Sequence, residues 1–224
     1  MSPPEPGRSP RYGLYVGLLA VLLLVLLAIN TAGTRHTAAR GIEPGHRLAP
    51  FAVPLALGQL TGDADIALRP DQGALGRVPA CAERGPQILN ICQLYERGPV
   101  VLALFVNGGG CAEILGDLQA LSSSFPGVRF AGVAIKGNRD GLRQLVRSRG
   151  LSFPVGIDSD GALAGLYKVA SCPQVSFALP GGVVQSRALL SRPALPVLRA
   201  RVSQLVAAAR AHGRGAPVAA RQFA

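Results

Sequence analysis

The sequence predicts an α/β sandwich with a mostly parallel central sheet. Apolar runs alternate with amphipathic segments along most of the chain, which is typical of parallel strands joined by helical crossovers. A Pro-Gly-Gly turn near the end predicts a closing hairpin, which adds antiparallel strands at one side of the sheet. The chain has 224 residues, 49% of them apolar, and is long enough for one domain with appendages.

Six apolar runs are predicted to be strands. Residues 99–106 form a continuous run with β-branched members, as expected of a strand buried on both faces. The predicted strands are residues 51–57, 99–106, 128–135, 153–157, 175–179 and 183–185. Residues 58–80 are rich in Gly, Asp and Pro and are predicted to form loops and a short hairpin.

Five segments with apolar residues at helical spacing are predicted to be helices. They are residues 85–97, 111–125, 140–149, 161–167 and 193–211. The first is bounded by Gly85-Pro86 and Gly98-Pro99, and Asp158 and Asp160 serve as turn and N-cap residues ahead of the fourth. The folded domain is predicted over residues 48–211, followed by a flexible tail over 212–224.

A membrane anchor is predicted near the N-terminus. Residues 12–32 lie within the uncharged run between Arg11 and Arg35, and a helix needs about 20 apolar residues to cross a bilayer. The alternative is a cleaved signal peptide, but the stretch is long for one and lacks a small-x-small cleavage pattern. Residues 1–11 are then a cytoplasmic stub and residues 33–47 a linker.

The net charge of +11 comes almost entirely from arginine, because Lys136 and Lys168 are the only lysines. A protein that binds nucleic acid usually concentrates its positive charge on one face and adds stacking aromatics. Here the arginines are scattered and aromatic residues are only 5% of the chain. We therefore expect a solvated basic surface, and no nucleic acid as a partner.

Four cysteines are present, which allows two disulfides with three possible pairings. An oxidising compartment would favour the bridges, and the cytosol would keep the thiols reduced. The four are Cys81, Cys92, Cys111 and Cys172. The three histidines lie in the linker and near the tail, and no Cys/His cluster has the spacing of a zinc site. The sequence predicts neither a metal ion nor a cofactor.

Cys111 stands in the most informative surroundings in the chain. It follows an apolar strand and three glycines, Gly108 to Gly110, and it precedes a helix-like segment. The dipole and free N–H groups of a helix N-terminus favour the thiolate over the thiol, and the glycine turn would leave the sulfur accessible. The alternative is a buried and inert cysteine. We expect Cys111 to be a nucleophile.

The stretch Phe105-Val106-Asn107-Gly108-Gly109-Gly110-Cys111-Ala112-Glu113-Ile114 resembles the F-Y-R-G-G-W-C-P-x-C segment of the thioredoxin-like superfamily, in its redoxin branch. That branch includes membrane-anchored thiol-disulfide oxidoreductases of the TlpA/ResA type and peroxiredoxin-like proteins of the AhpC/TSA type. The resemblance covers roughly residues 41–210. It implies a thioredoxin-like three-layer sandwich with a mixed sheet, preceded by one transmembrane helix, with Cys111 as the nucleophile.

The chain departs from the family pattern at four positions. Gly110 replaces the tryptophan before the nucleophile, and Ile114 occupies the position of the resolving cysteine. Leu104 and Gly108 stand where peroxiredoxins carry Pro and Thr, so a group that hydrogen-bonds the peroxide is missing. The missing Pro and Thr count against peroxidase chemistry, and the missing resolving cysteine favours a non-catalytic binding module with the same fold.

The resemblance also places Cys172-Pro173 at the family's cis-proline, beside the nucleophile. Cys172 would then replace the missing resolving cysteine, if its Cα lies within about 7 Å of that of Cys111. The alternatives are a small apolar filler and an ordinary trans-proline. We expect Cys81 and Cys92 to form a structural bridge; exchange of Cys92 with Cys111, or two reduced cysteines, are the alternatives.

We therefore expect a membrane-anchored thiol-disulfide oxidoreductase that acts on protein thiols or disulfides on the extracytoplasmic side, as a single-pass protein of the cell membrane. Cys111 would be its nucleophile and Cys172 its resolving cysteine. A non-catalytic thioredoxin-fold binding module with structural cysteines is the alternative, and a one-cysteine peroxidase is a third hypothesis. Glu113 is either a proton acceptor or an ordinary partner of the helix dipole.

Overall fold

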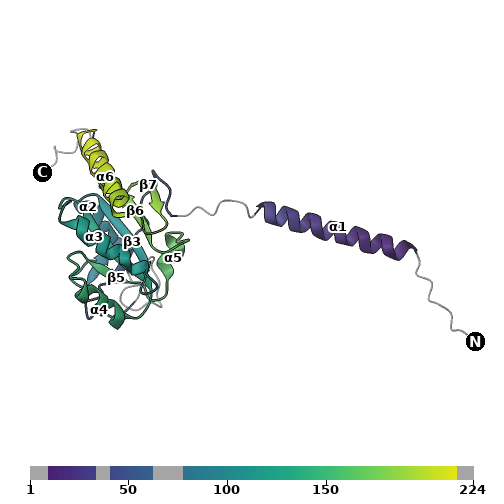
Figure 1. The fold of residues 1–224 in the computed structure, drawn as a ribbon, viewed down its shortest axis with the longest axis horizontal. Coiled ribbons are helices and arrows are strands. Elements are labelled where there is room, and N and C mark those ends of the chain that lie inside the picture. The colour runs from purple at the N-terminus through teal and green to yellow at the C-terminus, as the bar shows by residue number, and fades with distance from the viewer. Residues whose placement is uncertain (1–9, 34–40, 63–77, 216–224) are drawn as a thin grey trace, which may run out of the picture. The chain divides into compact units, whose positions relative to one another are not determined.

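The computed structural model describes residues 10–33, 41–62 and 78–215, and the chain divides into two units, Met1–Ala39 and Arg40–Ala224 (Figure 1). The first unit contains helix α1, Pro10–Gly33. Among the described residues, no helix is long and apolar enough to span a membrane. The anchor predicted over residues 12–32 therefore stays a prediction, and most of the stub predicted before it lies outside the described residues.

The second unit is built on a five-stranded mixed sheet with the strand order β5-β4-β3-β6-β7. Strand β3 (Val100–Val106) lies at the centre, parallel to β4 (Arg129–Lys136) and antiparallel to β6 (Gln174–Ala178). At the edges, β5 (Val155–Ile157) runs parallel to β4, and β7 (Val184–Leu189) runs antiparallel to β6. The predicted sheet, with a parallel part and an antiparallel closing hairpin, is confirmed.

Two hydrophobic cores lie on opposite faces of this sheet. Along β3, Val101 and Phe105 belong to one core and Leu102 and Leu104 to the other, because successive side chains of a strand point to opposite faces. The first core is covered by α3 (Ile114–Ser122), α4 (Arg139–Ser148) and α6 (Leu195–Gly215), and the second by α2 (Ile91–Arg97) and α5 (Ala162–Leu166). The fold is a three-layer α/β sandwich (Figure 1).

A separate two-stranded sheet, β1 (Ala52–Pro54) with β2 (Ile88–Asn90), also covers the second core. The sequence predicted that the residues of β2 belong to a helix beginning at Gly85-Pro86, and this was wrong. The Asn90 side chain accepts hydrogen bonds from the backbone N–H groups of Cys92 and Gln93, which fixes the helix start at Ile91. Short apolar runs do not distinguish a strand from a helix by periodicity alone.

Three further boundaries differ from prediction. The helix expected to begin at Cys111 starts with a short 3₁₀ segment, η2 (Cys111–Glu113), before α3. Helix α6 continues through residues 212–215, which were assigned to the tail. Part of the predicted linker packs on the domain, since the Gly41 N–H donates to the Lys168 carbonyl. Most of the loop segment expected over 58–80 lies outside the described residues, and its last part contains η1 (Ala80–Ala82).

Candidate active site

Cys111 lies beyond the carboxyl end of β3, after an exposed loop of three glycines. Gly108, Gly109 and Gly110 have φ values of 140°, 59° and 80°, a region that L side chains rarely adopt. Apart from the residues next to it in the chain, no described atom lies within 4 Å of a Cβ built on any of the three. The loop therefore leaves open space beside Cys111, which is itself half-buried.

Cys111 forms a disulfide with Cys172, and their Cα atoms are 5.5 Å apart. The two residues are 61 positions apart in the sequence, but the antiparallel pairing of β3 with β6 brings them together. Leu104 near the end of β3 pairs with Gln174 at the start of β6, so the residues just before β6 lie beside the end of β3. The Cys172-Pro173 peptide bond is cis, as the sequence predicted.

The sulfur of Cys172 receives a hydrogen bond from the backbone. The Val106 N–H donates to Cys172 Sγ over 3.1 Å. A donor that points at a sulfur stabilises the charged thiolate relative to the thiol. The arrangement makes the two sulfurs inequivalent, because it favours Cys172 as the sulfur that leaves when the bridge is attacked at Cys111.

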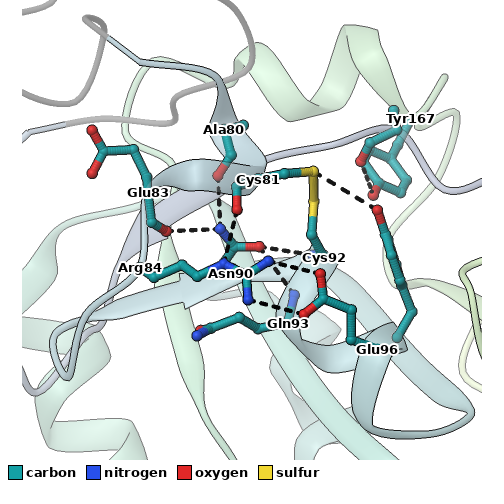
Figure 2. The surroundings of a disulfide bond; sticks show 11 residues. Ala80, Cys81, Glu83, Arg84, Asn90, Cys92, Gln93, Glu96 and Tyr167 are labelled. Carbon is teal, nitrogen blue, oxygen red and sulfur yellow. Dashed lines mark hydrogen bonds and ion pairs between the residues drawn. A yellow bond between two sulfur atoms is a disulfide. The ribbon is translucent and has the colours of Figure 1, made fainter. Parts of the chain in front are cut away.

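The second disulfide joins Cys81 and Cys92, whose Cα atoms are 5.4 Å apart (Figure 2). Cys92 is only 1% exposed and packs in the second core, whereas Cys172 packs against the first. The two disulfides therefore lie on opposite faces of the sheet, and all four cysteines are paired. The predicted Cys81–Cys92 bridge is present, and in this structure Cys92 is not paired with Cys111.

Asn90 ties the second disulfide to its surroundings (Figure 2). Besides capping α2, its side-chain amide donates to the backbone carbonyls of Ala80 and Glu83, each over 2.7 Å. An ion pair between Arg84 and Glu96 closes the same region, and the Arg84 guanidinium lowers the pKa of the Glu96 carboxyl. The Cys81–Cys92 disulfide is thus surrounded by the hydrogen bonds of Asn90 and the Arg84–Glu96 ion pair.

Arg149 contacts the segment that carries Cys111, and sequence reasoning missed it. Its guanidinium donates to the Ala112 carbonyl over 2.7 Å and forms an ion pair with Glu113. The sequence offered no signal, because Arg149 is one of many arginines and lies 36 residues from Glu113. The Val106 N–H was missed for a similar reason, since a backbone donor is not visible in residue identity.

The described residues contain no group of three or more His, Cys, Asp or Glu side chains that could hold a metal ion. Leu104 and Gly108, where peroxiredoxins carry Pro and Thr, are a buried strand residue and an exposed loop residue, and neither places a hydroxyl near Cys111.

No family model matches the chain, and no curated protein does. Solved structures match it. The thioredoxin domain of a thiol-disulfide oxidoreductase from Bacteroides vulgatus is 10% identical, with 74% of this chain and 99% of that chain covered and a TM-score of 0.53. Peroxidoxin BcpB from Mycobacterium tuberculosis is 15% identical, with 76% and 97% covered and a TM-score of 0.53.

A Chlorobium tepidum protein assigned as the thiol:disulfide interchange protein DsbE is 14% identical, with 75% of this chain and 98% of that chain covered and a TM-score of 0.55. At these identities the likeness establishes the fold and leaves activity to be argued from the site. The share of this chain that is covered is large enough to include most of the second unit. The fold of these structures is the one that the sequence resemblance implied. The chain therefore has the thioredoxin-like fold.

Proposed function

We propose that this protein is a thiol-disulfide oxidoreductase of protein thiols and disulfides, with Cys111 as nucleophile and Cys172 as resolving cysteine. The observation that carries the proposal is the half-buried Cys111–Cys172 pair beside an open glycine loop. The Cα separation of 5.5 Å lies in the range that a disulfide requires, so the pair can open and close without backbone movement.

The reaction proceeds in two exchange steps. The Cys111 thiolate attacks one sulfur of a substrate disulfide, the substrate S–S bond breaks, and the other substrate sulfur leaves with the electron pair and takes a proton from water. Cys172, having given its proton to water, then attacks Cys111 Sγ, and the second substrate sulfur leaves and is protonated. The substrate gains two electrons and two protons, and the protein keeps the Cys111–Cys172 disulfide.

A dithiol reductant must reopen that bridge before the next cycle. It attacks Cys111 Sγ, and Cys172 leaves as a thiolate that the Val106 N–H stabilises. The asymmetry of the two sulfurs thus directs the reductant and the substrate to the same atom. Run backwards, the same steps would oxidise a substrate dithiol.

Trapping tests the assignment of roles. The reduced full-length Cys172→Ser protein, treated with oxidised glutathione, should retain glutathione on Cys111 as a stable mixed disulfide seen by mass spectrometry. The Cys111→Ser protein should retain much less, and only wild type should accelerate the reduction of insulin by dithiothreitol. Full activity of the Cys111→Ser protein would overturn the proposal.

The alternative, a binding module with structural cysteines, gives a different result. In that case wild type would not accelerate insulin reduction, and the reduced Cys111 would accept glutathione no faster than an unfolded control peptide. No observation at the site favours a peroxidase, since the described residues near Cys111 lack the threonine hydroxyl of that class.

We further propose that the chain is anchored in the cell membrane through its N-terminal helix, with the domain on the extracytoplasmic side. The uncharged run between Arg11 and Arg35 supports this, as do the exposed apolar side chains of α1 from Leu14 to Leu26. Two disulfides fit an oxidising compartment. Protease added to intact cells should remove the domain from a membrane fraction that resists high-salt extraction; release by salt would contradict the anchor.

A further inference from the structure

Arg149 is built into the fold so that its guanidinium meets the segment of Cys111. It is the C-cap of α4, and its backbone N–H bonds to the carbonyls of Leu145 and Arg147. Its side chain is 24% exposed, low for an arginine. Helix α4 thus presents one fixed cation to η2, the short segment that carries Cys111.

Arg149 contacts the two residues that follow Cys111 in the chain. The guanidinium donates to the Ala112 carbonyl over 2.7 Å and forms an ion pair with the Glu113 carboxylate. Cys111 and Ala112 are neighbours in sequence, and Glu113 is two residues from Cys111 on the same short segment. A carboxylate on the segment that carries a thiolate disfavours it by like charge, whereas a carboxylate bound to a guanidinium does so much less.

Asp117 is the other acid on the helical segment that begins at Cys111. It lies on α3 and pairs with Arg192 from the segment after β7. Asp117 is therefore also neutralised. Glu113 and Asp117, the two acids on the helical segment that begins at Cys111, are therefore each bound by an arginine from another part of the chain.

We propose that Arg149 is a positioning residue for the thiol-disulfide reaction, which keeps Cys111 reactive by binding the Glu113 carboxylate and offsetting its charge. The inference rests on the proposed role of Cys111 as nucleophile. It decides between the two roles that the sequence left open for Glu113: the carboxylate is held by Arg149 and does not serve as the proton acceptor.

Charge swaps at these two positions test the inference. In a Cys172→Ser background Cys111 is the only free thiol, because Cys81 and Cys92 are bridged. The rate of its alkylation by iodoacetamide at pH 6 and low salt reports the thiolate fraction. Arg149→Gln should slow alkylation about threefold, and Glu113→Gln should accelerate it by a similar factor. The Glu113→Gln/Arg149→Gln protein should return close to the background rate.

Two controls separate electrostatics from structure. Arg149→Lys keeps the charge and should react at the background rate, and Arg147→Gln removes an exposed charge from the same helix and should change little. The effect of Arg149→Gln should shrink in 0.5 M salt, because screening weakens interactions between partly exposed charges. Each variant is checked for its melting temperature.

The inference is overturned if Arg149→Gln leaves the alkylation rate unchanged. It is also overturned if the double variant is as slow as Arg149→Gln, since a purely structural role of the Ala112 contact would give that result. Alkylation requires no turnover. A wild-type protein without oxidoreductase activity would therefore overturn the proposed function, while the alkylation rates would still test the role of Arg149.

Discussion

Gly182 lies directly against the ring of Tyr95. A Cβ added to Gly182 would come within 2.7 Å of Tyr95 Cδ1, closer than real side chains allow. The Gly181 N–H donates to the Tyr95 carbonyl, and the Tyr95 hydroxyl lies 3.8 Å from Cys81 Sγ. Tyr95 thus connects the hairpin of β6 and β7 to the structural disulfide, across the face opposite the Cys111–Cys172 pair.

Gly182→Ala should destabilise the protein more than Gly181→Ala. Both residues have φ near +84°, so both variants incur the left-handed backbone cost of about 1–2 kcal/mol. Only residue 182 also meets the ring, which adds about 1–3 kcal/mol for overpacking. Urea denaturation gives the difference between the two free energies of unfolding, and equal values would contradict the close packing.

The two disulfides should differ in the ease with which they are reduced. Cys92 is 1% exposed and only Cys81 of that bridge is half-buried, while Cys111 and Cys172 are both half-buried beside an open loop. Attack by a thiol requires access to sulfur, so the Cys111–Cys172 bridge should open at about tenfold lower dithiothreitol. Alkylation and mass spectrometry of a dithiothreitol series measure this; simultaneous opening of both bridges would count against the assignment of roles.

Asn90→Ala should destabilise the folded state by about 3 kcal/mol. The variant removes the cap of α2 and leaves the carbonyls of Ala80 and Glu83 without their amide donor. Asn90→Ser is the matched control, because its hydroxyl can cap α2 while the donors to the two carbonyls are lost, so its loss of stability should be smaller. Thermal or urea unfolding gives both values, and equal effects would show that the cap contributes nothing.

The buried hydroxyl of Tyr167 should lower the free energy of unfolding at alkaline pH. Burial raises its pKa well above the usual value of 10, and its hydroxyl donates to the Ala49 carbonyl over 2.7 Å. Above pH 10 the unfolded chain releases the phenol proton while the folded state keeps it, so the free energy of unfolding falls as pH rises. This amounts to about 1.4 kcal/mol at pH 11.

Tyr167→Phe should lack that fall. It should be less stable than wild type at pH 7 by about 1 kcal/mol, for the lost hydrogen bond, and the gap should close as the pH approaches 11. Unfolding in urea at pH 7, 9, 10 and 11 provides the comparison. A gap that stays constant across this range would mean that Tyr167 ionises in the folded state as readily as in the unfolded chain.

Much of the fold was predictable because its signals are local. The run over residues 99–106 became β3, the Pro-Gly-Gly turn became the β6–β7 hairpin, and the amphipathic stretch after Asn138 became α4. Helical periodicity failed at β2, where Ile88, Leu89 and Asn90 pair with β1 across more than thirty positions. Pairing over such a distance is decided by the partner strand and leaves no mark in the segment itself.

The sequence by itself determined the fold class, the cis-proline position and the identity of the four cysteines, because composition, turn residues and a family resemblance are all properties of contiguous residues. Only the tertiary structure decided which sulfurs pair and what surrounds them. The antiparallel register of β3 with β6 brings Cys172 to Cys111, and the packing of α4 on the sheet brings Arg149 to Glu113. Both contacts join residues more than thirty positions apart, and contact across that separation is set by packing.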